Sequence, residues 1–129
     1  MIGPRLYIIM REDIADMNPG KAMAQAAHAQ AEFDEHCDGE FALNDSFAHE
    51  YTQWRDGLAF GTTIVLRAEL HKLKEITSVI SHSGLVFDPT YPYRNWYGKL
   101  FTAEEITCAW ACAYSELDIE FMQQFALHE

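Results

Sequence analysis

Two segments of this sequence are apolar at consecutive positions rather than at every second position. They are residues 5–11 (RLYIIMR) and residues 106–113 (ITCAWACA). A strand shows this pattern when both of its faces are buried, so both segments are predicted as central strands of a sheet that helices cover on both sides. The 129 residues, 49% of them hydrophobic, supply enough apolar surface for such a core, and we expect residues 1–129 to form a single domain.

The remaining segments alternate between helical and extended patterns. Helices are predicted at residues 19–37, 44–55, 69–82 and 116–126, and two further strands at residues 62–68 and 85–88. Residues 89–103, rich in Pro, Tyr and Trp, are predicted as a long ordered loop. The resulting order, β-α-α-β-α-β-β-α, is typical of a three-layer α/β/α fold with a four-stranded mixed sheet.

The first predicted helix has a clear start and a polar stripe. Asn18 stands where a helix N-cap is expected, and Pro19 takes the first helical position, which proline favours. On a helix of 3.6 residues per turn, one stripe gathers polar side chains and the opposite side gathers alanines that can pack closely on a sheet. The stripe consists of Lys21, Gln25, His28, Glu32 and Glu35, and the alanines are Ala24, Ala27 and Ala31. Such a stripe is either a solvated helix face or one wall of a site.

Lys21 lies in the first turn of this helix, where unpaired backbone N–H groups and the helix dipole already form a positive pole. A lysine there is mildly unfavourable for the helix. It becomes useful when an anion, or a carbonyl oxygen that gains negative charge, binds at that place. Gly20 beside it allows a ligand to approach the backbone. The residues by themselves favour neither interpretation: Lys21 has a role in function, or it stands at this position by chance.

The sequence around Lys21 resembles the signature of the peptidyl-tRNA hydrolase 2 family. Arg11, Asp13 and Met17 give R-x-D-x-x-x-M, and residues 20–29 (GKAMAQAAHA) match the family's G-K-x-x-A-Q-x-x-H-A at unbroken spacing. The resemblance implies the α/β fold of that family and hydrolysis of the ester between a peptide and the 3′ end of tRNA. It implies neither a metal ion nor an organic cofactor, and it suggests a homodimer.

The resemblance also implies site residues in both halves of the chain. Lys21, Asp88 and Thr107 are expected to be catalytic, with Lys21 stabilising the oxyanion and Asp88 orienting or deprotonating the attacking water. Substrate contacts are expected from Gly20, Gln25, His28, Thr90 and Arg94. Asp88 before a proline also fits an ordinary turn, and Thr107 also fits ordinary strand material. The A-G pair after the family's aspartate and the P-G turn before its last strand have no counterpart here.

The net charge of −11, from 9 basic and 20 acidic residues, opposes broad nucleic-acid binding. Phosphate contacts from Lys and Arg supply much of the affinity of nucleic-acid-binding proteins, so peptidyl-tRNA requires a local basic face here, around Lys21, Arg94 and Lys99. Two other functions stay open. One is an acidic binding protein of the same fold that takes a basic partner protein or mimics nucleic acid. The other is a hydrolase of a smaller ester or nucleotide.

Simpler patterns predict the cellular location of the protein and the residues that take no part in a site. No apolar run approaches the ~18 residues of a membrane helix, so no membrane partner is expected. Three cysteines, Cys37, Cys108 and Cys112, fit neither a disulfide framework nor a metal site, and we expect buried thiols in a reducing cytoplasm. Trp54 and Trp110 are expected in the core. Surface positions without metal ligation are expected for His36, His49, His71 and His82.

The aromatic residues of segment 89–103 have three readings. They are Tyr91, Tyr93, Trp96, Tyr97 and Phe101. They form part of the core, a dimer contact, or a surface that stacks on the terminal adenosine of a tRNA.

Overall fold

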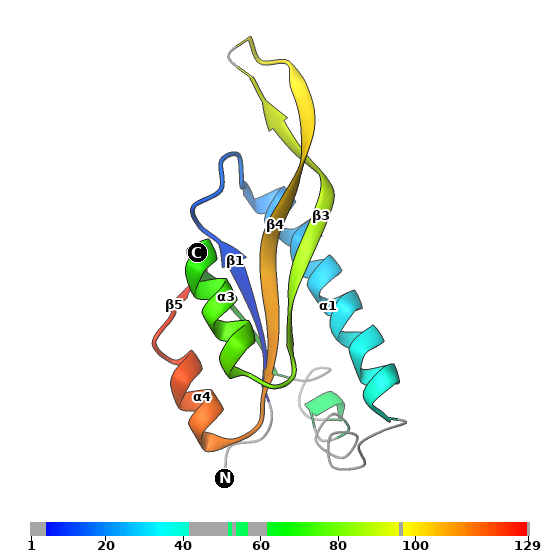
Figure 1. The fold of residues 1–129 in the computed structure, drawn as a ribbon, viewed down its shortest axis with the longest axis vertical. Coiled ribbons are helices and arrows are strands. Elements are labelled where there is room, and N and C mark those ends of the chain that lie inside the picture. Colours follow the sequence, from blue (N-terminus) through cyan, green and yellow to red (C-terminus); the bar gives the residue numbers. More distant parts are fainter. Residues whose placement is uncertain (1–4, 42–51, 53, 57–61, 96, 129) are drawn as a thin grey trace.

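A computed structural model describes residues 5–41, 52, 54–56, 62–95 and 97–128, with only the backbone described for residues 38–41. It contains a five-stranded mixed sheet in the order β3-β4-β1-β2-β5 (Figure 1). β1 pairs parallel with β2, and the other neighbours pair antiparallel. The elements are β1 (Arg5–Arg11), α1 (Pro19–Phe41), β2 (Thr63–Ala68), α3 (Leu70–Val79), β3 (Ser83–Arg94), β4 (Leu100–Ala113), α4 (Glu116–Met122) and β5 (Ala126–Leu127).

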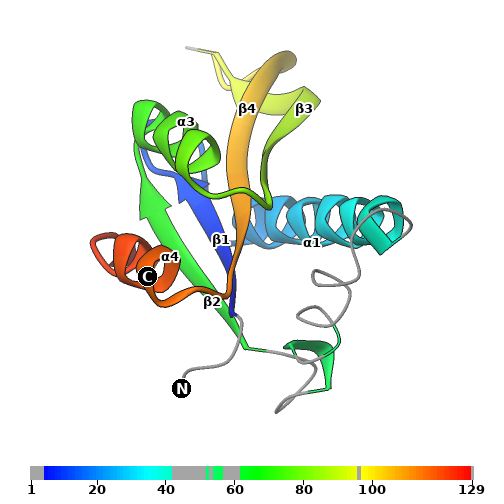
Figure 2. The ribbon, with the colours of Figure 1, turned by 60° about the horizontal axis from the view of Figure 1, so that its bottom comes forward.

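Helices cover both faces of the sheet, as the fully apolar strands predicted. Five consecutive residues of β1 are buried, and β1 and β4 lie side by side inside the sheet. On one face, β1 residues such as Ile8 pack against Phe33 of α1. On the other face, β1 residues such as Ile9 pack against Ile76 of α3 and Met122 of α4. Figure 2 shows α1 on one side of the sheet and both α3 and α4 on the opposite side. Burying each large apolar side chain contributes about 1.5–3 kcal/mol.

Helix α1 begins as predicted. The Lys21 backbone N–H donates to Oδ1 of Asn18 at 2.9 Å, which caps the first turn. The helix runs four residues beyond the predicted end at Cys37, because a single glycine at position 39 costs only about 1 kcal/mol and does not stop a helix.

The predicted orientation of α1 was wrong. Ala24, Ala27 and Ala31 are exposed, whereas Gln25, together with Ala29, is buried against the sheet. The sheet-facing side of the helix therefore includes a member of the polar stripe.

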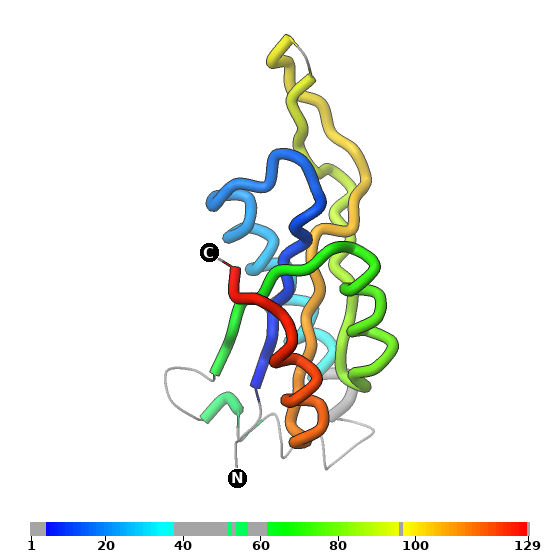
Figure 3. Tube along the Cα trace, turned by 90° about the vertical axis from the view of Figure 1, so that its left-hand side faces the viewer, coloured from blue at the N-terminus to red at the C-terminus, as the bar shows by residue number. Residues whose placement is uncertain are grey.

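The predicted four-stranded sheet needs two corrections. A fifth strand, β5, pairs with β2 near the C-terminus; its two residues are too few to show a strand pattern. The predicted loop at 89–103 is instead a two-stranded ribbon in which the ends of β3 and β4 pair and project from the body of the molecule (Figures 1 and 3). Pro89 and Pro92 suggested a loop, but β3 is an edge strand, where proline is tolerated.

The β3–β4 pairing contains two β-bulges, and both lie beside α1. Val86 pairs with Cys108 but Phe87 pairs with Ile106, so Thr107 is the extra residue on β4. The second shift falls between Asp88 and Tyr91 on β3. A bulge redirects the side chains at and beside it; Thr107 is the bulged residue of the first, and Asp88 lies between the two.

Other expectations have mixed outcomes. The predicted helix at 44–55 lies mostly outside the described residues, as do His49 and Trp96. Trp54 and Trp110 are buried, and so are the thiols of all three cysteines, as predicted. The surface prediction was wrong for His82, which is buried with its Nδ1 3.0 Å from Nε2 of His36. Among the described helices, none is long and apolar enough to cross a membrane.

Candidate active site

A chain of three polar side chains links α1, β3 and β4. The Thr107 hydroxyl donates to Oε1 of Gln25 at 2.6 Å, and Nε2 of Gln25 donates to Oδ2 of Asp88 at 2.8 Å. Gln25 is 3% exposed and Thr107 is 0% exposed. Because a carboxylate only accepts hydrogen bonds, the amide nitrogen of Gln25 must point at Asp88, and the oxygen is left to accept from Thr107. The orientation of the buried amide is therefore fixed from both sides.

The Asp88 carboxylate receives further donors on its second oxygen. The Thr90 backbone N–H donates to Oδ1 of Asp88 at 2.9 Å, and the Thr90 hydroxyl donates to the same atom at 3.4 Å. Partial burial acts to raise the pKa of Asp88, but the hydrogen bonds from Thr90 and Gln25 outweigh it and hold the pKa below its ordinary value. The group therefore stays ionised at neutral pH and gains its proton only in acid.

Lys21 lies one helical turn before Gln25 and contacts the base of the ribbon. Its Nζ donates to the backbone oxygen of Pro92 at 2.8 Å and lies 5.2 Å from the centroid of the Tyr91 ring. A cation is attracted to the face of an aromatic ring at this separation. An ammonium has three N–H donors, so Lys21 can hold the ribbon and still donate to an oxygen of a ligand.

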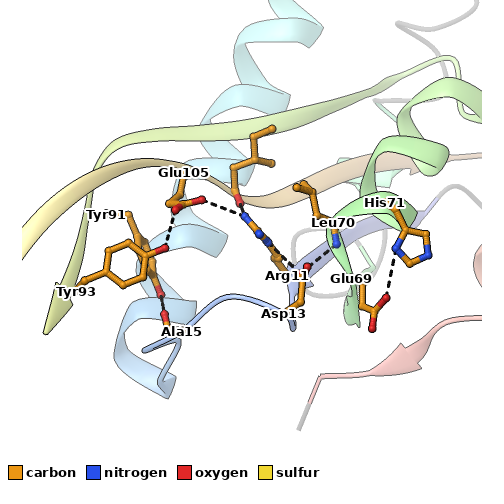
Figure 4. A network of polar contacts seen from close by, with 10 residues as sticks. Arg11, Asp13, Ala15, Glu69, Leu70, His71, Tyr91, Tyr93 and Glu105 are labelled. Atoms are coloured by element: carbon orange, nitrogen blue, oxygen red, sulfur yellow. Dashed lines mark hydrogen bonds and ion pairs between the residues drawn. The ribbon is translucent and has the colours of Figure 1, made fainter. Parts of the chain in front are cut away.

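Tyr91, the ring under the Lys21 ammonium, is buried. Its hydroxyl donates to the backbone oxygen of Ala15 at 3.3 Å (Figure 4). Burial raises the pKa of Tyr91, and the carboxylates of Asp16, Asp88 and Glu105 raise it further. The Lys21 ammonium over this ring and Gln25, which binds Asp88, come from successive turns of α1, so the helix brings the ammonium and the carboxylate to the same part of the fold.

A second polar network, built on Arg11, fixes the base of the ribbon (Figure 4). Nη1 of Arg11 donates to Oε2 of Glu105 at 3.1 Å and to the backbone oxygen of Ile106 at 3.2 Å. The Tyr93 hydroxyl donates to the other carboxylate oxygen, Oε1, of Glu105 at 2.8 Å. Burial raises the pKa of Tyr93, and the Glu105 carboxylate raises it further. Arg11 therefore holds the ribbon strand β4 at the end of β1.

Asp13 continues this network to α3. Nε of Arg11 donates to Oδ1 of Asp13 at 2.9 Å, and the Leu70 backbone N–H donates to the same oxygen at 3.1 Å. Burial acts to raise the pKa of Asp13, but Arg11 and the Leu70 N–H outweigh it and lower the pKa. The R-x-D pattern of Arg11 and Asp13 thus has a structural role, because it connects β1, α3 and β4 through hydrogen bonds. The sequence pattern gave no sign of its partners Glu105 and Tyr93, because nothing in the spacing joins position 11 to the ribbon.

An open groove of about 440 Å³ runs from Asp88 along the side of α1. Its lining includes His28, Glu32 and Glu35 from the helix and Phe87 and Thr90 from β3. Burial raises the pKa of Glu32, and the nearby Glu35 carboxylate raises it further, against lowering contributions from Trp110 and His28. The groove therefore favours a positively charged or polar ligand.

The predicted site residues separate into two groups. Lys21, Gln25, Asp88, Thr90 and Thr107 come together around the Asp88 carboxylate and the ring of Tyr91, and His28 lines the adjoining groove. These residues come from α1, β3 and β4, so only the tertiary fold brings them together.

The remaining two predicted residues lie at the margins. Gly20 is exposed in the first turn of α1, and an added Cβ would meet Oδ1 of Asn18 at an ordinary 3.5 Å, so packing does not require a glycine there. Arg94 directs Nη1 to the backbone oxygen of Gly98 at 3.0 Å, and its backbone N–H donates to Oδ2 of Asp16 at 3.0 Å. The Arg94 guanidinium thus belongs to the ribbon turn rather than to the Asp88 cluster.

We expect Thr107→Val to lower the free energy of unfolding by about 1–3 kcal/mol, because the isosteric change leaves the buried oxygen of Gln25 without its donor. Chemical denaturation measures this loss. Thr102→Val is the matched control, since Thr102 is exposed on the same strand. Equal stability of the two variants would contradict the role assigned to the buried hydroxyl.

We expect Gln25→Met to raise the pKa of Asp88, because the substitution removes a hydrogen bond that favours the ionised carboxylate. An NMR titration of the side-chain carboxyl carbon measures this pKa directly. Gln30→Met is the control, because Gln30 donates to Asp34 on the exposed side of the same helix. An Asp88 pKa that is the same in wild type and Gln25→Met would show that Gln25 does not tune the carboxylate.

A known protein family matches the chain that carries this geometry. A comparison with curated proteins found no match to the chain. A family model described as peptidyl-tRNA hydrolase PTH2 matches residues 5–90, more than half of the chain. The match includes Lys21, Gln25 and Asp88 and stops where the ribbon begins, so Thr107 lies beyond it. On this match, the chain belongs to the peptidyl-tRNA hydrolase PTH2 family.

Proposed function

We propose that this protein hydrolyses the ester bond between a peptide and the 3′ end of a tRNA, with residues 1–129 acting as one domain. The observation that carries the proposal is a cation and an ionised carboxylate held at successive turns of α1, with Lys21 over Tyr91 and Asp88 at Gln25. The Lys21 ammonium stands at the N-terminal end of α1, and the Asp88 carboxylate is oriented by Gln25 and Thr107. Membership of the PTH2 family supports the choice of substrate.

Lys21 stabilises the oxyanion in this proposal. When water adds to the ester carbon, the carbonyl oxygen gains negative charge, and an ammonium beside a helix N-terminus lowers the energy of that charge. The ammonium already binds one carbonyl oxygen, that of Pro92, at 2.8 Å. It therefore presents donors suited to the same type of atom in the substrate.

Asp88 orients the attacking water. Its lowered pKa supports this role, because a carboxylate that stays ionised at neutral pH is a weak base toward a whole proton yet accepts a hydrogen bond from water. As water adds and the bond to the ribose oxygen breaks, the proton released from the water passes to that leaving oxygen. Asp88 keeps the water aligned through both events.

Gln25 and Thr107 are positioning residues in this scheme. Both are buried, and Thr107 reaches Asp88 through the Gln25 amide. Thr90 holds the second oxygen of the carboxylate. These contacts limit the rotation of the Asp88 side chain, which preserves a fixed direction for the water.

The groove beside Asp88 supports a second candidate, an acidic binding protein for a basic partner. Glu32, Glu35 and Asp88 place three carboxyl groups along one open groove. Such a protein would bind a cationic peptide without hydrolysing peptidyl-tRNA. A homodimer, suggested by the family resemblance, stays a prediction under either function.

Release of free tRNA from a purified peptidyl-tRNA tests the proposed reaction. We expect wild type to release tRNA, Lys21→Ala to lower kcat/KM by about 10²–10³-fold through the lost oxyanion contact, and Asp88→Asn to lower it by about 10²–10⁴-fold. Lys74→Ala, which removes an exposed lysine of α3, should retain the wild-type rate.

Circular dichroism shows whether each variant keeps its fold. A folded Lys21→Ala variant with an unchanged rate would remove Lys21 from the mechanism. A folded wild type that releases no tRNA, and that binds a basic peptide through the Glu32 and Glu35 groove, would replace the hydrolase by the binding protein.

A further inference from the structure

The ribbon formed by residues 89–103 differs in charge from the rest of the protein. It contains two basic residues, Arg94 and Lys99, and no Asp or Glu, in a chain with 20 acidic and 9 basic residues. It also exposes large apolar side chains, with Tyr97 93%, Leu100 58% and Phe101 49% exposed. An extension that is both basic and aromatic is therefore attached to an otherwise acidic molecule.

Hydrogen bonds join the described residues at the tip of the ribbon, Asn95 and residues 97–99. Oδ1 of Asn95 accepts from the backbone N–H groups of Tyr97 at 2.9 Å and Lys99 at 3.0 Å, and the Asn95 N–H donates to the Lys99 oxygen at 3.0 Å. Gly98 has a φ of 74°, a left-handed conformation that glycine adopts without strain. The Arg94 guanidinium closes the turn on the Gly98 oxygen. The exposed Tyr97 is thus tied to Asn95 through its own backbone N–H.

The ribbon is continuous with the proposed active site. At its base, Pro92 accepts from Lys21 and Tyr91 lies under the Lys21 ammonium. An aromatic series runs outward from there. The ring centroids of Tyr91 and Tyr93 are 5.0 Å apart, and Tyr93 stacks on Phe101 at 5.5 Å. A ligand lying along this series would have one end at Lys21.

The chemistry of the ribbon selects among possible occupants. Strand addition by a second copy is disfavoured, because Pro89 and Pro92 remove two N–H donors from the edge strand β3. A basic partner protein is repelled by Arg94 and Lys99. Single-stranded RNA fits both features, since its bases stack on aromatic rings and its phosphates pair with basic side chains.

We propose that the described part of the ribbon, residues 89–95 and 97–103, binds the single-stranded 3′ end of the RNA substrate and directs it to Lys21. Tyr97 and Phe101 provide rings for stacking, and Arg94 and Lys99 contact phosphates. The identity of this RNA as the end of a tRNA rests on the proposed function. The family match ends at residue 90, so Arg94, Tyr97, Lys99 and Phe101 lie beyond the matched residues.

Fluorescence anisotropy with a short, 5′-labelled single-stranded RNA ending in CCA tests the proposal without requiring turnover. We expect Tyr97→Ala to weaken binding about tenfold, in the range found for one lost base–aromatic stack, and Tyr97→Phe to retain the affinity. Leu117→Ala is the matched control, because Leu117 is 78% exposed on α4. Since Tyr97 is almost fully exposed, its substitution should leave the fold intact.

The charge contribution is tested with the same probe at several salt concentrations. We expect Lys99→Gln to reduce the slope of log affinity against log salt by about 0.7, the value for one phosphate contact on a single strand, and Lys74→Gln to leave the slope unchanged. Equal RNA affinity for wild type, Tyr97→Ala and Lys99→Gln would overturn the proposal. So would a change in oligomeric state in Tyr97→Ala without a change in RNA binding.

The outcomes for the ribbon and for catalysis are separable. If RNA binding depends on Tyr97 but wild type releases no tRNA, the ribbon binds RNA and the proposed hydrolysis is wrong. If Lys21→Ala abolishes hydrolysis but the ribbon variants bind RNA as tightly as wild type, the protein is a hydrolase and the proposed RNA surface is wrong.

Discussion

The hydrogen bonds of one buried amide, that of Gln25, determine how the parts of the candidate site meet. A polar side chain buried between a helix and a sheet is costly unless its donors and acceptors are paired. Gln25 obtains a donor from Thr107 on β4 and an acceptor from Asp88 on β3. This pairing fixes the rotation of α1 over the sheet. It requires both strands to be in register, and the two β-bulges lie beside the residues that meet the amide.

The arrangement of charge follows from the same positions. The helix start brings Lys21 to the base of the ribbon, and the stripe on α1 continues into the Glu32 and Glu35 groove on the far side of Asp88. The ribbon and Lys21 thus form a cationic and aromatic side, whose base also holds Asp16 and Glu105 in hydrogen bonds, and the groove along the helix is acidic. A net charge of −11 remains compatible with an RNA substrate if contacts to the RNA are confined to the cationic side.

Elements of the fold were predictable from sequence where a single local feature, such as an apolar run or a helix cap, determines the structure. The apolar run of β1 gave its two ends, and Asn18 with Pro19 gave the start of α1. The prediction that the alanine face of α1 packs on the sheet was wrong. Helical periodicity treats a glutamine as solvent-facing and takes no account of hydrogen-bond partners from distant strands. The ribbon was read as a loop because proline counts against a strand until the strand is known to be at an edge. Thr107 was recognised only through the family resemblance, since its bulge depends on the pairing partner.

A double-mutant cycle on the hydrolysis of peptidyl-tRNA tests most directly whether the hydrogen-bonded side chains of Thr107, Gln25 and Asp88 act as one unit. The value of kcat/KM is compared for wild type, Thr107→Val, Asp88→Asn and the double variant. If Thr107 acts only by positioning Asp88, the double variant should be no slower than Asp88→Asn alone. Losses that multiply, so that the double variant is slower by the product of the two single effects, would contradict the link through Gln25.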